Sequence, residues 1–67
     1  MINFKVYEVG SGEFLFEYKG SSTPREGELI FHHEYDGFLE VDYVTHSIIA
    51  IDDSLTEEFV EIGVTLN

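Results

Sequence analysis

The chain has 67 residues, 43% of them hydrophobic, and its fourteen Asp and Glu against three Lys and Arg leave a formal net charge of -11 at pH 7. A chain of about 60 residues buries only ~60% of its unfolded surface, so we expect one small domain over residues 1–67 and exclude enzymes that need a large α/β scaffold. The negative charge argues against direct binding of nucleic acid or of anionic membranes, because both require Lys and Arg next to phosphates.

The first predicted element is a β-hairpin. The segments 2–9 and 13–19 both alternate between apolar and polar residues, which is the period of a half-buried strand. Gly10-Ser11-Gly12 lies between them and favours a tight turn. We therefore expect these two strands to pair with each other in an antiparallel arrangement.

Three further strands are predicted in the middle of the chain. Turn-forming residues over 20–27 end the first hairpin, and a third strand follows over 28–33. Asp36-Gly37 is a strong hairpin signal that leads into a fourth strand over 38–46. The mostly apolar segment 47–51 is expected to form a fifth strand at the centre of the sheet.

The last quarter of the chain is compatible with two structures. Ser54-Leu55-Thr56-Glu57 fits a helix capping box, whereas the apolar alternation over 60–66 fits a strand. We predict one short helical turn near 54–57 and then a strand over 58–66, and a two-turn helix ending at Gly63 is the alternative. The predicted fold is all-β: a small antiparallel barrel of five to six strands with this one helical turn.

The aromatic residues are expected to divide between core and surface. Large rings dominate the energetics of small cores. The rings expected in the core are Phe14, Phe16, Phe31, Phe38, Tyr43 and Phe59. Tyr35 lies in the second turn and is expected to be exposed, where a tyrosine surrounded by acids can anchor a partner.

Two segments of the chain carry a resemblance to a known group of proteins. Pro24–Ile30 has the form Pro-x-x-Gly-acid-x-aliphatic, and Phe38–His46 follows it after a turn. Together they resemble small phage and prophage proteins with SH3-like β-barrels, although Glu40 and Asp42 add two carboxylates to the usual pattern. The resemblance implies an SH3-like barrel and a phage origin, and it supplies no catalytic residue.

Carboxylates recur at strand spacings along the chain. Residues i and i+2 of a strand lie about 6.7 Å apart, which is of the order of the phosphate spacing along a nucleic-acid strand. Such rows are expected to bind Lys and Arg of a basic protein, and a solvated acidic shell without a partner is the alternative. The candidate partner-binding residues are Glu13, Glu17, Tyr35, Glu40, Asp42, Asp52, Asp53, Glu57 and Glu61.

Other kinds of site are not favoured. The sequence contains no Ser-His-Asp arrangement and no glycine-rich phosphate loop, so we predict neither an enzyme nor a cofactor. A zinc site would need the second hairpin to bring His46 close to His32 or His33, and we favour hydrogen-bonded surface histidines over bound metal. Cysteine is absent, as are a basic leader and a long apolar segment, so we expect a cytoplasmic location without membrane contact.

These features predict a non-enzymatic inhibitor or adaptor, encoded by a phage and acting in the host cytoplasm. It is expected to mimic nucleic acid and so bind a basic surface of a host nucleic-acid-processing or defence protein. The alternative is a structural or assembly module, either a phage morphogenesis component or an oligomerising SH3-like domain, that binds through apolar edge strands. Separately, an open edge strand would support a homodimer. Salt should separate the two, because screening weakens charge-driven binding and leaves apolar edge pairing intact.

Overall fold

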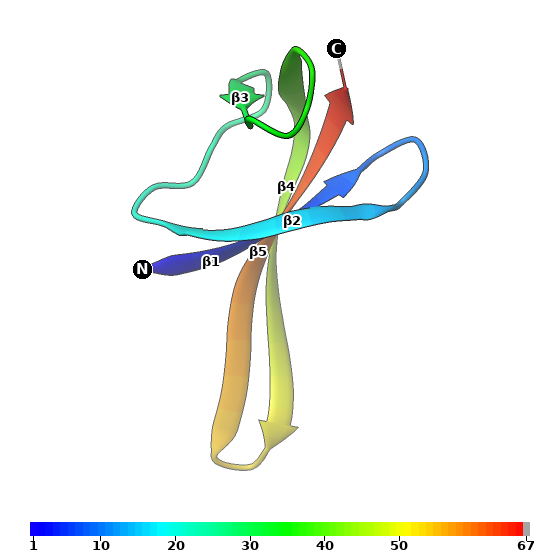
Figure 1. Cartoon of the computed structure of the whole chain (residues 1–67). Coiled ribbons are helices and arrows are strands. Elements are labelled where there is room, and N and C mark those ends of the chain that lie inside the picture. The colour runs from blue at the N-terminus through cyan, green and yellow to red at the C-terminus, as the bar shows by residue number, and fades with distance from the viewer. Residues whose placement is uncertain (67) are drawn as a thin grey trace.

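The computed structural model describes residues 1–66, and these residues form five β-strands and no helix (Figure 1). The all-β prediction is therefore confirmed. The strands are β1 (Ile2–Glu8), β2 (Phe14–Gly20), β3 (Leu29–Phe31), β4 (Phe38–Asp52) and β5 (Leu55–Leu66). They form one curled sheet, a half-barrel, in the order β2-β1-β5-β4-β3.

The centre of the sheet differs from the predicted antiparallel arrangement. β1 and β5 run parallel, from Phe4 opposite Val60 to Glu8 opposite Val64, whereas the other three pairs of neighbouring strands are antiparallel. Local turns can join only antiparallel neighbours, and a parallel pair requires a long connection. Here β2, β3 and β4 all lie between β1 and β5 in the sequence. No local sequence pattern therefore indicates that β1 and β5 pair.

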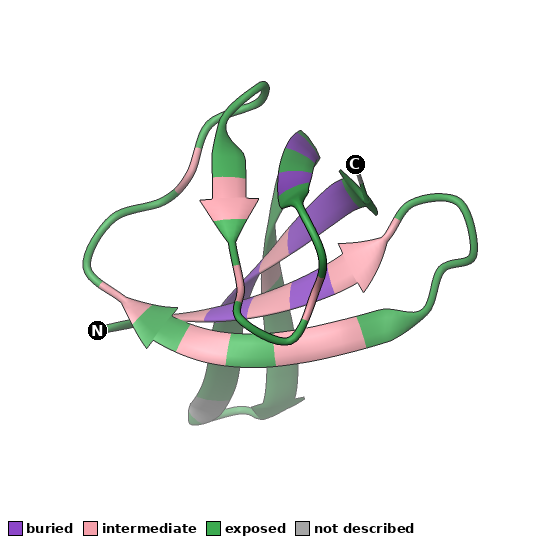
Figure 2. Cartoon of the chain, turned by 45° about the horizontal axis from the view of Figure 1, so that its top comes forward, coloured by how far each residue is buried: buried purple, intermediate pink, exposed green. Residues whose placement is uncertain are grey.

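The core lies on the concave side of the three middle strands, which carry the buried positions in Figure 2. Alternate residues of each strand point into it, as expected for a sheet with one buried face. The core cluster consists of Phe4, Val6, Leu39, Val41, Val60, Ile62 and Val64.

Side chains close the open side of the half-barrel. The edge strands β2 and β3 are not neighbours in the sheet. Phe16 of β2 packs against Tyr35 and His32, with ring centroids 6.0 and 4.3 Å apart, and the Tyr35 hydroxyl donates a hydrogen bond of 3.4 Å to the Leu15 carbonyl. On the same side, burial raises the pKa of the Tyr18 phenol, because desolvation disfavours the tyrosinate.

The predicted fourth and fifth strands are one strand. β4 has 15 residues and forms a long hairpin with β5, which helps make the molecule 43 Å long and only 20 Å thick. The predicted helical turn at 54–57 is wrong, as is the alternative helix ending at Gly63. The Asp52 carboxylate accepts hydrogen bonds from the Ser54 backbone N–H (2.8 Å) and hydroxyl (3.1 Å), so the expected capping residues stabilise a tight turn instead.

The end of this hairpin projects beyond the sheet as an arm, residues 47–59, that extends away from the other strands in Figure 1. The segment 47–51 was expected at the centre of the sheet, yet the side chains of Ile48, Ile49 and Ile51 are 64%, 49% and 56% exposed. No other strand covers them, because β1 pairs with β5 only from Val60 onward.

Most of the aromatic rings predicted in the core are also exposed. Phe59 is buried and Phe16 is half-buried, as expected. The prediction is wrong for the other four, which lie at sheet edges or on the outer face: Phe14, Phe31, Phe38 and Tyr43. Tyr35 was expected to be exposed and is instead half-buried against the core.

Candidate functional site

The face of the sheet opposite the core, which we call the outer face, carries part of the predicted acidic set. Lys5 lies between the core residues Phe4 and Val6, so its side chain points to this outer face. The register places Lys5 opposite Glu17 of β2 on one side and opposite Glu61 of β5 on the other. Side chains of directly paired residues share a face, so Glu17 and Glu61 lie on the outer face as well.

β4 adds two further carboxylates to the outer face. Glu40 lies between the buried Leu39 and Val41 and pairs with Thr65. Asp42 is the extra residue of a β-bulge, and its carboxylate accepts a hydrogen bond from the Thr65 hydroxyl. Thr65 therefore brings Glu40 and Asp42 together at one end of the face.

The middle of the outer face is apolar. The Tyr43 ring lies directly over Gly63, which has no side chain to obstruct it. Phe59 is 6% exposed, and the Lys5 ammonium lies 4.3 Å from the centroid of its ring, within cation–π range. This arrangement was not predicted, although the alternation of Lys5 with core residues could have indicated its face.

Glu57 completes the acidic set on this side. It lies two residues before Phe59 on β5 and pairs with Ile49, so by strand alternation its side chain belongs to the outer face. Five of the predicted residues therefore share one face: Glu17, Glu40, Asp42, Glu57 and Glu61. Lys5 lies between Glu17 and Glu61 and partly compensates their charge, whereas the register places no Lys or Arg opposite Glu40 or Glu57.

The remaining predicted residues lie elsewhere. Glu13 is exposed in the turn before β2, and its backbone N–H donates to the Ser11 hydroxyl at 3.2 Å. Asp52 and Asp53 lie at the tip of the arm. Tyr35 packs on the core side of the sheet, so it does not share a surface with the acidic set.

The histidines are dispersed. His32 stacks on His33 with ring centroids 4.8 Å apart, and His33 lies 3.9 Å from the carboxylate of Glu34. His46 instead faces Glu58 of β5 across 3.7 Å. Over residues 1–66, no group of three or more potential ligands is arranged to hold a metal ion.

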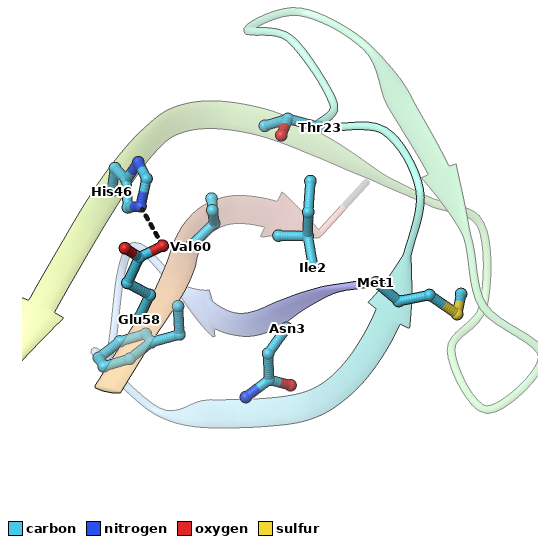
Figure 3. Close-up of a pocket in the computed structure, with 8 residues that line it drawn as sticks. Met1, Ile2, Asn3, Thr23, His46, Glu58 and Val60 are labelled. Carbon is cyan, nitrogen blue, oxygen red and sulfur yellow. Dashed lines mark ion pairs between the residues drawn. The ribbon is translucent and has the colours of Figure 1, made fainter. Parts of the chain in front are cut away.

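A small cavity of about 300 Å³ lies where β1 begins beside β5 (Figure 3). Its polar side includes the ion pair of His46 and Glu58, drawn as a dashed line, and both side chains are more than 60% exposed. Exposed ion pairs contribute little energy and provide no desolvated acid–base pair.

No known protein family, curated protein or solved structure matches the chain. Among the described residues, no helix has the length and apolar character needed to cross a membrane.

Proposed function

We propose that this protein is a non-enzymatic inhibitor or adaptor that binds a basic surface of another protein through its acidic outer face. The observation that carries the proposal is the strand register, which gathers five carboxylates from three strands on one side of the sheet. The net charge of -11 adds long-range attraction toward a basic partner.

The partner that suits this face best is a nucleic-acid-processing or defence protein. Its basic groove is shaped for phosphates, and the sheet offers carboxylates in short rows, with Glu40 and Asp42 two residues apart on β4 and Glu57 and Glu61 four residues apart on β5. The exposed part of the Tyr43 ring lies beside Asp42 and can bury apolar area at such an interface. Charges alone would give fast association, and the ring adds contact area that slows dissociation.

The proposal includes a phage or other mobile element as the source, with the host cytoplasm as the place of action. Its support is the resemblance of residues 24–46 to small phage and prophage proteins.

Capture from a bacterial lysate tests the proposal. The protein is immobilised, bound proteins are eluted with a salt gradient, and each fraction is identified by mass spectrometry. We expect a basic nucleic-acid-binding protein to elute at moderate salt and to be displaced by added DNA or RNA, since charge-driven contacts are screened within about 10 Å at 0.1 M salt.

A charge-reversed pair locates the binding face. Glu40→Lys with Asp42→Lys should weaken binding of the captured protein by about tenfold or more, because attraction becomes repulsion. Glu26→Lys with Glu34→Lys is the matched control: it makes the same change in net charge at exposed loop positions. Equal losses in both pairs would show that net charge alone drives capture and would contradict the proposed face.

A further inference from the structure

β4 has a long open edge. From Tyr43 to Ala50 it pairs with β5 on one side, while β3 pairs with β4 only over residues 38–40. The last backbone contacts on the β3 side are at Val41, whose N–H donates to the Glu28 carbonyl at 2.9 Å and whose carbonyl accepts from Gly27 at 2.8 Å. Beyond Val41, the β3 side of this strand is left without a neighbouring strand in the sheet.

This edge lacks the usual protection. Natural edge strands are kept apart by charged residues, proline or short length. The segment 43–51 has the sequence Tyr-Val-Thr-His-Ser-Ile-Ile-Ala-Ile, which contains no Asp, Glu, Lys, Arg or Pro. Among the described strands of this acidic chain it is the longest open edge without a carboxylate, since the other uncharged edge, β3, has only three residues.

The arm also needs stabilisation on both faces. Ile48 points to the core side and Ile49 to the outer side, whereas Ile51 is the extra residue of a second β-bulge. All three side chains are about half exposed or more. A two-stranded ribbon alone in water is marginally stable, and a third strand with an apolar face improves it. The arm would therefore gain from a further strand along β4.

From these features we infer that two copies of the chain pair through their β4 edges, in an antiparallel arrangement about a two-fold axis at Ser47. The charge distribution selects a second copy along this edge, because the opposite edge of the arm, on β5, carries Glu57 and Glu58. The free edge of β2 carries Glu17, and the uncharged free edge of β3 has only three residues, so neither offers an uncharged edge of comparable length.

The register follows from the limits of the uncharged segment. With Ser47 opposite itself, the uncharged residues 43–51 pair only with one another, Ile49 opposite Thr45 and Ile51 opposite Tyr43 of the second copy. Asp42 and Asp52 then lie opposite each other just beyond the two ends of this segment, where their repulsion is open to screening by salt. Moving the axis by one residue toward the tip would place Val44 against Asp52, a carboxylate. The strand of the second copy then occupies the edge that β3 leaves open beyond Val41.

The dimer has a geometric consequence for the acidic surface. A two-fold axis between antiparallel edge strands is perpendicular to the sheet, so both outer faces point to the same side. The inference stands independently of the proposed function, because the β4 edge and the outer-face carboxylates are different groups.

Sedimentation equilibrium at several protein and salt concentrations tests the inference. A pairing of one strand edge is small, so we expect a weak dimer with a dissociation constant of roughly 1–100 µM and a mass of twice 7.7 kDa. The dimer should become tighter as NaCl is raised, because salt screens the repulsion between the two chains. Binding to a basic partner should instead weaken, so the two proposals can fail separately.

The variant Ile49→Glu should weaken the dimer by about tenfold or more, since it brings an unpaired carboxylate against the second copy. Phe31→Glu is the matched control: it places the same charge at an exposed apolar residue of β3, and it should dimerise like the wild type. Circular dichroism checks that both variants remain folded.

Three outcomes would overturn the inference. The first is a wild-type monomer at all concentrations up to about 1 mM in high salt, which would leave the edge free or reserved for a different protein. The second is a dimer that Ile49→Glu leaves intact. The third is a dimer in which the backbone amides of 43–51 exchange with solvent as fast as they do in the monomer.

Discussion

Gly63 shapes the outer face because it has no side chain. An ideal Cβ at this position would lie 1.9 Å from a carbon of the Tyr43 ring, far inside van der Waals contact. The absence of a side chain lets the ring lie directly over the Gly63 backbone. A tyrosine held in this way is ordered before a partner arrives, which lowers the entropic cost of burying it.

Gly63→Ala should destabilise the protein by about 1–3 kcal/mol, because the Tyr43 ring must leave its place or the backbone must shift. Urea unfolding measures the effect. In a Tyr43→Ala background the same substitution should cost less than about 0.5 kcal/mol, since the obstructing ring is gone. Equal costs in the two backgrounds would show that the ring contact is not the cause.

Residue chemistry also explains which side chains lie where the sequence predicts them and which do not. All five outer-face carboxylates are exposed or half exposed, as an unpaired charge must be. The aromatic residues had no such constraint, because a ring is stable in the core and is also common at a surface edge. Phe31 and Phe38 accordingly pack on each other outside the core, with centroids 6.1 Å apart.

At the scale of elements, the β1–β2 turn is held by contacts between residues that are close in the sequence. Gly12 has a positive φ of 73°, and its N–H donates a hydrogen bond of 2.8 Å to the Glu8 carbonyl. The Ser11 hydroxyl adds a hydrogen bond of 2.6 Å to the Glu8 carboxylate. These contacts link residues three and four apart, so the sequence pattern alone could predict the turn.

Gly12→Ala should destabilise the protein by about 1–2 kcal/mol, because a Cβ is unfavourable at this positive φ. Gly10→Ala is the matched control in the same turn, where φ is not positive and no atom lies within 4 Å of the added Cβ. We expect that variant to stay within about 0.5 kcal/mol of the wild type. Thermal unfolding compares the two, and a similar loss in both would contradict the role of backbone conformation.

The β4–β5 hairpin is an element whose secondary structure local sequence does not determine. Asp52 and Ser54 signal a chain reversal, and a helix start and a tight β-turn use the same side-chain acceptors. The choice between them depends on whether the following residues find a strand to pair with. β4 is available over its whole length, so pairing prevails and the predicted helical turn does not form.

At the scale of the whole molecule, charge and shape act together. The chain spreads fourteen carboxylates over a molecule 43 Å long and 25 Å wide, so many of them are within mutual repulsion range. Net charges beyond a magnitude of about 8 are unusual for a small domain, and they oppose compaction.

Raising NaCl from about 20 to 300 mM should therefore increase the melting temperature by several degrees, as screening shortens the range of the repulsion. The melting temperature is measured by circular dichroism at low protein concentration, so that the transition is that of the monomer. Tetramethylammonium chloride should act like NaCl, because screening depends on ionic strength rather than on the cation. A melting temperature that is flat or falls with salt would contradict this account.

The sequence alone determined the all-β composition, the first hairpin, the exposure of the acids and the absence of charge over 43–51. Each of these depends on interactions within a few residues, or on the cost of removing a charge from water. Only the tertiary structure decided that β1 and β5 run parallel and that 47–51 leaves the sheet as an arm, because these depend on which distant strands pair. The bulge at Asp42 decided the faces of β4: one extra residue shifts the alternation, so Tyr43 leaves the core side of Leu39 and Val41 and joins the carboxylates on the outer face.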